Sequence, residues 1–172
     1  MENKVVRLEG GLGIVIRPIR RDGVARLAEG IRKLSPQSRQ MRFFSTRELY
    51  SEAELRHVVE ADGIEALTLV AATLDEAGEE AESIAAAHFF RNGPGSDCAE
   101  VAIAVLDAYH RLGVGTTLLS ELALEAKAVG IRRWSGICST DNVAIMRLIA
   151  KVGKVELLRC ASATYHFELR LF

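Results

Sequence analysis

The chain has 172 residues, 49% of them hydrophobic and 26% charged, which is typical of one soluble globular domain. The net charge of −1 argues against general attraction to nucleic acid or to a membrane surface. No apolar run approaches the roughly 20 residues of a membrane-spanning helix. The three cysteines form no CxxC pair, so we expect neither a zinc site nor a disulfide framework. The start lacks the apolar core of a signal peptide, and we expect a reduced, cytoplasmic protein.

In chain order, the start of the sequence looks lightly attached. We assign residues 1–12 to an N-terminal extension and residues 13–172 to a single domain. Residues 13–21 alternate as a strand does, and Pro18 confines that strand to an edge or an end. Three helices should follow, because each has a start signal: Asp22 as an N-cap, Ser35-Pro36, and Ser51 with Glu54 as a capping box.

The middle and the end of the chain predict the rest of a mixed α/β domain. Two apolar runs, 65–74 and 83–91, flank an acidic turn and should form an antiparallel hairpin. Further along, we expect a strand at 98–106, a long helix at 113–129, a strand at 131–139, a helix at 141–153 and two closing strands. The last of these helices should be capped by Asp141 or Ser139 and stopped by Gly153.

The stretch "RLGVGT" lies where the long helix begins. Free N–H groups at a helix start, together with the helix dipole, suit a phosphate, and glycines let a ligand approach the backbone closely. A Walker loop is excluded because Thr116, not lysine, follows Gly115. A dinucleotide fingerprint is excluded because Leu118 occupies the place of its third glycine. From these residues alone, a simple turn remains an equal alternative.

The surrounding run "AEVAIAVLDAYHRLGVGTTLLSELALEAKAVGIRRWSGICSTDNVAIMRLIAKVG" resembles the GNAT family of acyl-CoA-dependent N-acetyltransferases. The family motif Gln/Arg-x-x-Gly-x-Gly/Ala here begins with His110, a departure from the usual Gln or Arg. The earlier stretch "LSPQSRQMRFF" resembles the branch of bacterial protein-lysine acetyltransferases. The resemblance implies a GNAT fold, which is a mostly antiparallel central sheet flanked by helices in one domain.

The resemblance also implies acetyl-CoA as co-substrate and assigns its contacts. The loop would hold the pyrophosphate through Arg111, Leu112, Gly113, Val114, Gly115 and Thr116. The strand from Val101 to Val105, including Ile103, would splay from its neighbour and pair with the pantetheine arm. Asn142 would lie near the same arm, although it is also an ordinary polar residue at a helix start.

Acetyl transfer to an amine needs a neutral amine, hence a base, and an N–H donor for the thioester oxygen. Glu100 is our candidate base, because small and apolar neighbours in "CAEVA" should raise its pKa and because the protein-lysine branch has a glutamate in a similar strand. The N–H of Val105 or a near neighbour would be the donor. Many GNAT enzymes use a tyrosine as general acid, but that place falls at Ile149. Tyr165 and Tyr109 could replace it, although packing roles are expected for both.

Other residues are weaker candidates. We expect His88 to be a core or cleft histidine, Cys138 to be no nucleophile, and the basic residues between Arg17 and Lys33 to form a solvated face. The sequence favours a protein lysine as acceptor, with a small amine as the close alternative. A non-enzymatic acyl-CoA sensor is the alternative from another class. No metal is expected, and a homodimer is possible.

Overall fold

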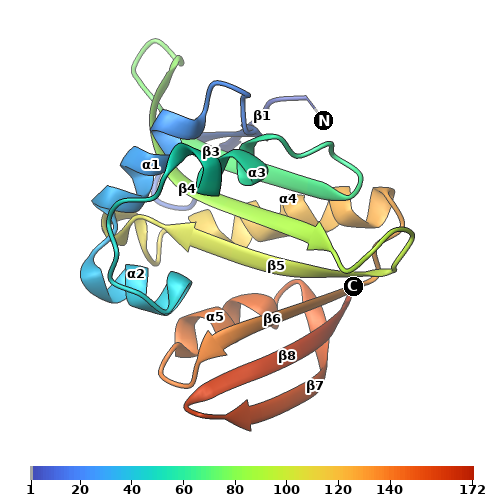
Figure 1. The fold of residues 1–172 in the computed structure, drawn as a ribbon. Helices are drawn as coiled ribbons and strands as arrows, with labels where there is room; N and C mark the ends of the chain where they lie inside the picture. The colour runs from blue at the N-terminus through green and yellow to red at the C-terminus, as the bar shows by residue number, and fades with distance from the viewer. Residues whose placement is uncertain (1) are drawn as a thin grey trace.

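The computed structural model describes residues 2–172, and its strands form one 8-stranded sheet with helices on both faces (Figure 1). Across the sheet the order is β1-β2-β3-β4-β5-β6-β8-β7, and the only parallel pair among the described strands is β5 with β6. The strands are β1 (Lys4–Arg7), β2 (Gly13–Pro18), β3 (Ala66–Leu74), β4 (Glu80–Arg91), β5 (Cys98–Val105), β6 (Arg133–Ser139), β7 (Gly153–Ala161) and β8 (Thr164–Leu171). The prediction of a mostly antiparallel sheet is therefore confirmed.

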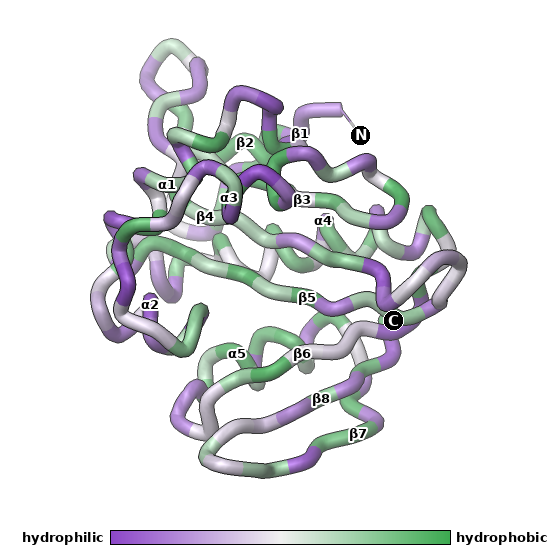
Figure 2. Tube along the Cα trace, in the orientation of Figure 1, coloured by the Kyte–Doolittle hydropathy of each residue, from purple (hydrophilic) through white to green (hydrophobic). Residues whose placement is uncertain are grey.

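One face of the sheet is covered by α4 (Val114–Ala128), which packs on β3, β4 and β5 and lies behind the sheet in Figure 1. The predicted apolar stripe of this helix is fully buried, at Leu118, Leu119, Leu122 and Ala126. The residues of β3, β4 and β5 that face α4 belong to the same core. Figure 2 shows these three strands as largely hydrophobic. This packing makes β5 and the start of α4 a rigid unit.

The opposite face carries α1 (Val24–Lys33), α2 (Pro36–Phe43) and α3 (Glu52–Val59). Two predicted helix starts are confirmed. The Ser35 hydroxyl accepts a hydrogen bond from the Ser38 N–H (3.1 Å), and Ser51 with Glu54 forms the capping box. Helix α2 contacts both β5 and β6, and Figure 1 shows it at the end where these two strands diverge.

The N-terminal part of the chain differs from its prediction. Residues expected to be lightly attached form β1, in which Val5 and Val6 pair with the edge of β2. β-Branched residues beside a free strand edge favour this pairing. Helix α1 begins after Gly23, which makes no side-chain cap, so the prediction of Asp22 as N-cap is wrong. The sequence predicted that Pro18 confines its strand to an edge or an end, and Pro18 is the last residue of β2.

The last helix, α5 (Val143–Ile149), is shorter than expected. Asn142 caps it, since its side-chain oxygen accepts a hydrogen bond from the Ile145 N–H (3.1 Å), so the predicted caps Asp141 and Ser139 are wrong. Gly153 does not stop the helix but begins β7. A Cβ at Gly153 would lie 2.3 Å from a Leu169 methyl carbon, and close strand packing therefore explains this glycine.

The basic stretch near the N-terminus is only partly a solvated face. Arg17 is 4% exposed and forms a bidentate ion pair with Glu80, which Arg20 and Arg26 also approach. Arg17 is the next-to-last residue of β2, opposite Val70 on β3, and its buried guanidinium needs a partner of opposite charge. No helix among the described residues is both long and apolar enough to cross a bilayer.

Candidate acetyltransferase site

The glycine loop presents backbone N–H groups at the start of α4. Gly113 is the N-cap residue and has φ +86°, and Arg111 also has a positive φ of +63°. The Thr117 N–H donates to the Gly113 carbonyl (3.0 Å). Within residues 2–172, the N–H groups of residues 111–116 have no hydrogen-bond partner. Free donors and the positive end of the helix dipole together suit a pyrophosphate.

Close packing holds this loop against β5 and α5. A Cβ added to Gly115 would lie 3.3 Å from a Leu148 methyl carbon and 3.6 Å from Val105. His110, the departure from the family motif, bonds through Nε2 to the Val105 carbonyl (2.9 Å). Because a carbonyl only accepts, Nε2 carries the hydrogen. His110 therefore ties the loop to the end of β5.

Strands β5 and β6 separate soon after they meet. They pair only from Cys98 with Arg133 to Glu100 with Ser135. Beyond Glu100, the backbone of β5 has no strand on its β6 side, and Figure 1 shows the two strands diverging towards α2. The predicted splay is therefore confirmed. The side chains of Ile103 and Val105 pack against the core cluster, so any contact with a pantetheine arm would come from their backbone.

Glu100 lies at the point where the strands separate. Its side chain is exposed, so it is not enclosed by apolar neighbours as expected from the sequence. It lines a groove of about 510 Å³ that continues over β6, β8 and β7. Register puts Glu100, Ser135 and Glu168 in one row across the floor of this groove. Glu168 pairs with Arg133 (3.5 Å), and Arg159 also lines the groove. Among the described residues Glu100 has no ion pair within 4.0 Å, so its carboxylate is the one that suits an incoming cation, such as a lysine ammonium.

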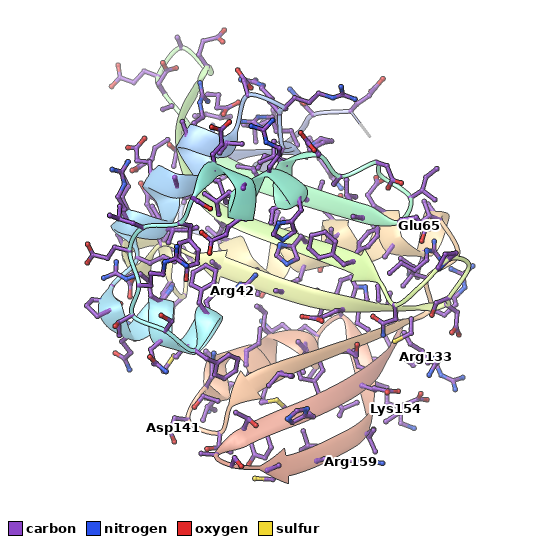
Figure 3. The ribbon with its side chains drawn as sticks, in the orientation of Figure 1. Arg42, Glu65, Arg133, Asp141, Lys154 and Arg159 are labelled. Carbon is purple, nitrogen blue, oxygen red and sulfur yellow. The ribbon has the colours of Figure 1, made fainter. Side chains whose placement is uncertain are left out.

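Arg42 on α2 is a site residue that sequence reasoning missed. Its Nη2 lies 3.3 Å from His88 Nε2, and Figure 3 shows Arg42 projecting from α2 towards β5. Burial lowers the pKa of Arg42 to about 10, although the charge of Glu100 acts to raise it. Arg42 thus remains protonated at neutral pH. The "RFF" end of the quoted motif contains Arg42 and was the available signal.

His88 is a half-buried residue of β4, as expected of a core or cleft histidine. Burial, followed by the charge of Arg42, lowers the pKa of His88 to about 3, so the ring is neutral at physiological pH. Its Nε2 can therefore accept the Arg42 hydrogen bond. A neutral ring of this kind positions Arg42 and is no proton reservoir at pH 7.

Asp107 joins α2 to the glycine loop and was also missed. Its carboxylate accepts hydrogen bonds from the Ser35 N–H (3.0 Å), the Ser35 hydroxyl (2.7 Å) and the Ser38 hydroxyl (2.8 Å). Desolvation acts to raise the pKa of Asp107, but these hydrogen bonds outweigh it and lower the pKa. Asp107 belongs to the short helix η1 (Asp107–Tyr109) between β5 and the loop. The serines of "LSPQSR" therefore connect the start of α2 to the segment that precedes the glycine loop.

The remaining sequence candidates have mainly structural contacts. Asn142 uses its side-chain oxygen to cap α5, which leaves only its NH₂ group for a ligand. Ile149 is fully buried. The Tyr109 hydroxyl donates to Glu82 (3.1 Å), and Tyr165 packs against the core. Burial raises the pKa of the Cys138 thiol, which argues against a thiolate nucleophile.

Comparison with known proteins agrees with this geometry. The model of the Acetyltransferase (GNAT) family matches residues 36–153. Acetyltransferase Pat of Mycolicibacterium smegmatis is 30% identical over 150 residues, which are 87% of this chain but only 44% of that protein. The chain thus spans less than half the length of this curated relative.

Two solved structures share the fold. The GNAT domain of S. lividans PAT superposes with a TM-score of 0.84 at 26% identity, covering 98% of this chain and 97% of that one. The yncA protein of Salmonella typhimurium, determined with its cofactor acetyl-CoA, has a TM-score of 0.69 at 18% identity and covers 92% of each chain. The family resemblance seen in the sequence is confirmed: the chain belongs to the GNAT acetyltransferase family.

Proposed function

We propose that this chain transfers the acetyl group of acetyl-CoA to a primary amine, and that the amine is a protein lysine side chain. The observation that supports this most is the open groove of about 510 Å³ at the end of the free β5 edge. An open groove admits a lysine carried on a large protein, whereas a small amine would favour a closed pocket. The identity to Acetyltransferase Pat supports acetyl transfer, and the resemblance of "LSPQSRQMRFF" supports a protein lysine as acceptor.

We propose the following roles for the chain's own residues. The free N–H groups of residues 111–116 bind the pyrophosphate, and the unpaired edge of β5 binds the pantetheine amides. A backbone N–H group on the free edge of β5, between Glu100 and Val105, donates to the thioester oxygen as charge develops on it. Asn142 can offer only its NH₂ group to the same arm.

Glu100 is the proposed base. A lysine ammonium has an ordinary pKa of about 10.4, so at neutral pH it must lose a proton before it attacks. The Glu100 carboxylate lies in the groove where that proton would be released, either directly or through a water molecule. The thioester bond then breaks in favour of an amide, and coenzyme A leaves as a thiolate. A thiolate is a tolerable leaving group, which is consistent with Ile149 in place of a tyrosine.

The test compares wild type with Glu100→Gln and with Glu76→Gln, an exposed glutamate in the β3–β4 turn. Thiol release from acetyl-CoA is measured over a panel of proteins and small amines, and acetyl-CoA binding is measured by calorimetry. Loss of a general base should lower kcat/KM by about 10²–10⁴-fold. Glu76→Gln should match wild type.

Each outcome decides between the candidate functions. Stimulation by proteins that is lost in Glu100→Gln supports the proposal, whereas stimulation by small amines alone moves the acceptor to that class. Tight acetyl-CoA binding without turnover on any amine would instead identify an acyl-CoA sensor. Full activity of Glu100→Gln would remove Glu100 from the mechanism.

A further inference from the structure

A cavity lies on the same face of the sheet as the groove, but farther along β5. It has a volume of about 110 Å³ and lies under α1 and α2, above the neighbouring residues Ala86 on β4 and Ala104 on β5. A cavity needs about 10–15 Å³ to hold one water molecule, so this cavity has room for several heavy atoms. The two alanines leave the space open, because larger side chains at these positions would fill it.

Among the described residues that line the cavity, Arg42 is the arginine with no carboxylate oxygen within 4.0 Å. Arg17, Arg20 and Arg26 line it, but all three pair with Glu80. Arg42 also lines it, and among the described residues its guanidinium forms no ion pair within 4.0 Å; its hydrogen bond goes to the neutral ring of His88. A half-buried guanidinium normally has an anionic partner, since desolvation of a lone charge is costly.

The position of the cavity along β5 points to the ligand. Glu100 and the groove lie near the start of the strand, whereas Ala104 lies four residues later, about 13 Å along the strand. An acyl group held at the free edge of β5 would lie between them. Its far end would then enter the cavity and approach Arg42, while the amine acceptor would use the groove on the other side.

We propose that this cavity is a subsite for acyl groups that are longer than acetyl and end in a carboxylate, such as the succinyl group of succinyl-CoA, with Arg42 binding the terminal carboxylate. The guanidinium fork matches two carboxylate oxygens. The negative charge of Glu100 reaches Arg42 and repels the terminal carboxylate of the acyl group. The positive charge of Arg42 offsets that repulsion. This inference rests on the proposed function, because it assumes that acyl-CoA binds along β5.

The transfer is the same reaction as with acetyl-CoA. The neutral amine nitrogen attacks the thioester carbonyl carbon, a C–N bond forms and the C–S bond breaks. The sulfur leaves with the electron pair as a thiolate. Glu100 keeps the proton taken from the ammonium, and the second proton, which the nitrogen loses on forming the amide, passes to the thiolate directly or through water. The terminal carboxylate takes no part, and no oxidant or reductant is needed.

The experiment compares three acyl-CoA donors: acetyl-CoA, butyryl-CoA and succinyl-CoA. Butyryl and succinyl both have four carbons and differ in the terminal methyl or carboxylate. Dissociation constants are measured by calorimetry without acceptor, and kcat/KM is measured with the best acceptor. The proteins are wild type, Arg42→Met, Arg42→Lys, Ala86→Leu and the control Arg56→Gln, an exposed arginine on α3.

Wild type should bind succinyl-CoA more tightly than butyryl-CoA. Loss of a hydrogen bond to a charged group should lower this succinyl-to-butyryl preference about tenfold or more in Arg42→Met, by binding and by kcat/KM. Arg42→Lys should keep part of the preference, because it retains the charge. Ala86→Leu should disfavour both four-carbon donors relative to acetyl-CoA, and Arg56→Gln should match wild type.

Two results would overturn the inference while leaving the proposed function intact. One is acetyl transfer with no binding of succinyl-CoA. The other is an Arg42→Met variant that weakens all three donors equally, which would assign Arg42 to the acceptor or to the fold. If acetyl-CoA itself does not bind, the proposed function fails, and this subsite fails with it.

Discussion

The ion pair between Glu80 and Arg17 allows a quantitative test of the fold beside the site. Arg17 is 4% exposed and Glu80 15% exposed, and the two form a bidentate pair that includes an Nε–Oε2 distance of 2.8 Å. Glu80→Gln keeps the shape but removes the charge, which leaves a buried guanidinium without its counter-charge. Breaking a buried pair in this way costs about 3–5 kcal/mol.

The lower end of that range is the better estimate. The Arg17 guanidinium also donates to the Pro18 carbonyl (3.1 Å), and glutamine would keep one acceptor oxygen. We therefore expect a loss of about 3 kcal/mol in the free energy of unfolding. For a chain of this size each kcal/mol lowers Tm by about 2–4 °C, so the expected decrease is roughly 6–12 °C.

The assay is equilibrium unfolding in denaturant between pH 3 and pH 8. The hydrogen bond from Arg17 lowers the pKa of Glu80 in the folded protein, more than desolvation raises it. The stability that Glu80 contributes is thus present above its unfolded pKa of about 4.3 and is lost as pH falls through the lower folded pKa. The difference between wild type and Glu80→Gln should be largest near neutral pH and shrink in acid.

Glu52→Gln is the matched control, because Glu52 pairs with Arg56 on the surface of α3 with both side chains more than half exposed. Its effect should stay below about 0.5 kcal/mol. The reasoning is refuted if Glu80→Gln destabilises no more than Glu52→Gln, or if its effect is the same at pH 4 as at pH 7.

Two further predictions concern the acceptor side. Asp107→Ala removes three hydrogen bonds to Ser35 and Ser38, so hydrogen exchange in residues 36–43 should become faster, and unchanged exchange would show that Asp107 does not hold α2. His88 stays neutral when folded, with a pKa of about 3, whereas the unfolded chain binds its proton near pH 6.5, so stability should rise from pH 5 to 6.5 by up to about 2 kcal/mol from this group. Unfolding titrations should find this slope reduced in His88→Gln, and an unchanged slope would contradict the burial of the ring.

Local signals in the sequence were reliable where a side chain forms a hydrogen bond with backbone a few residues away. The capping box at Ser51 and the cap at Ser35 were predicted and observed, because a side-chain oxygen and a nearby N–H decide the helix start. The predictions failed where a distant partner decides. Gly153 fits closely against Leu169 in the next strand, and β1 forms only because β2 offers it an edge.

The candidate site divides in the same way. The glycine loop could be found from the sequence because it needs only positive φ at Gly113 and free N–H groups at a helix start. Glu100 could be placed on the correct strand, but its exposure depends on where β6 leaves β5. Arg42 and Asp107 could not be assigned, because their contacts join segments of the chain that lie far apart in the sequence.

The sequence by itself thus determined the family, the order of the elements and the anion-binding loop, since these follow from short-range geometry and from a contiguous motif. Only the tertiary structure decided which charges are neutralised. Glu80 pairs with three arginines from the N-terminal region, whereas Arg42 contacts the neutral His88 beside the cavity. Charge pairing depends on distance and burial in three dimensions, and neither can be obtained from spacing along the chain.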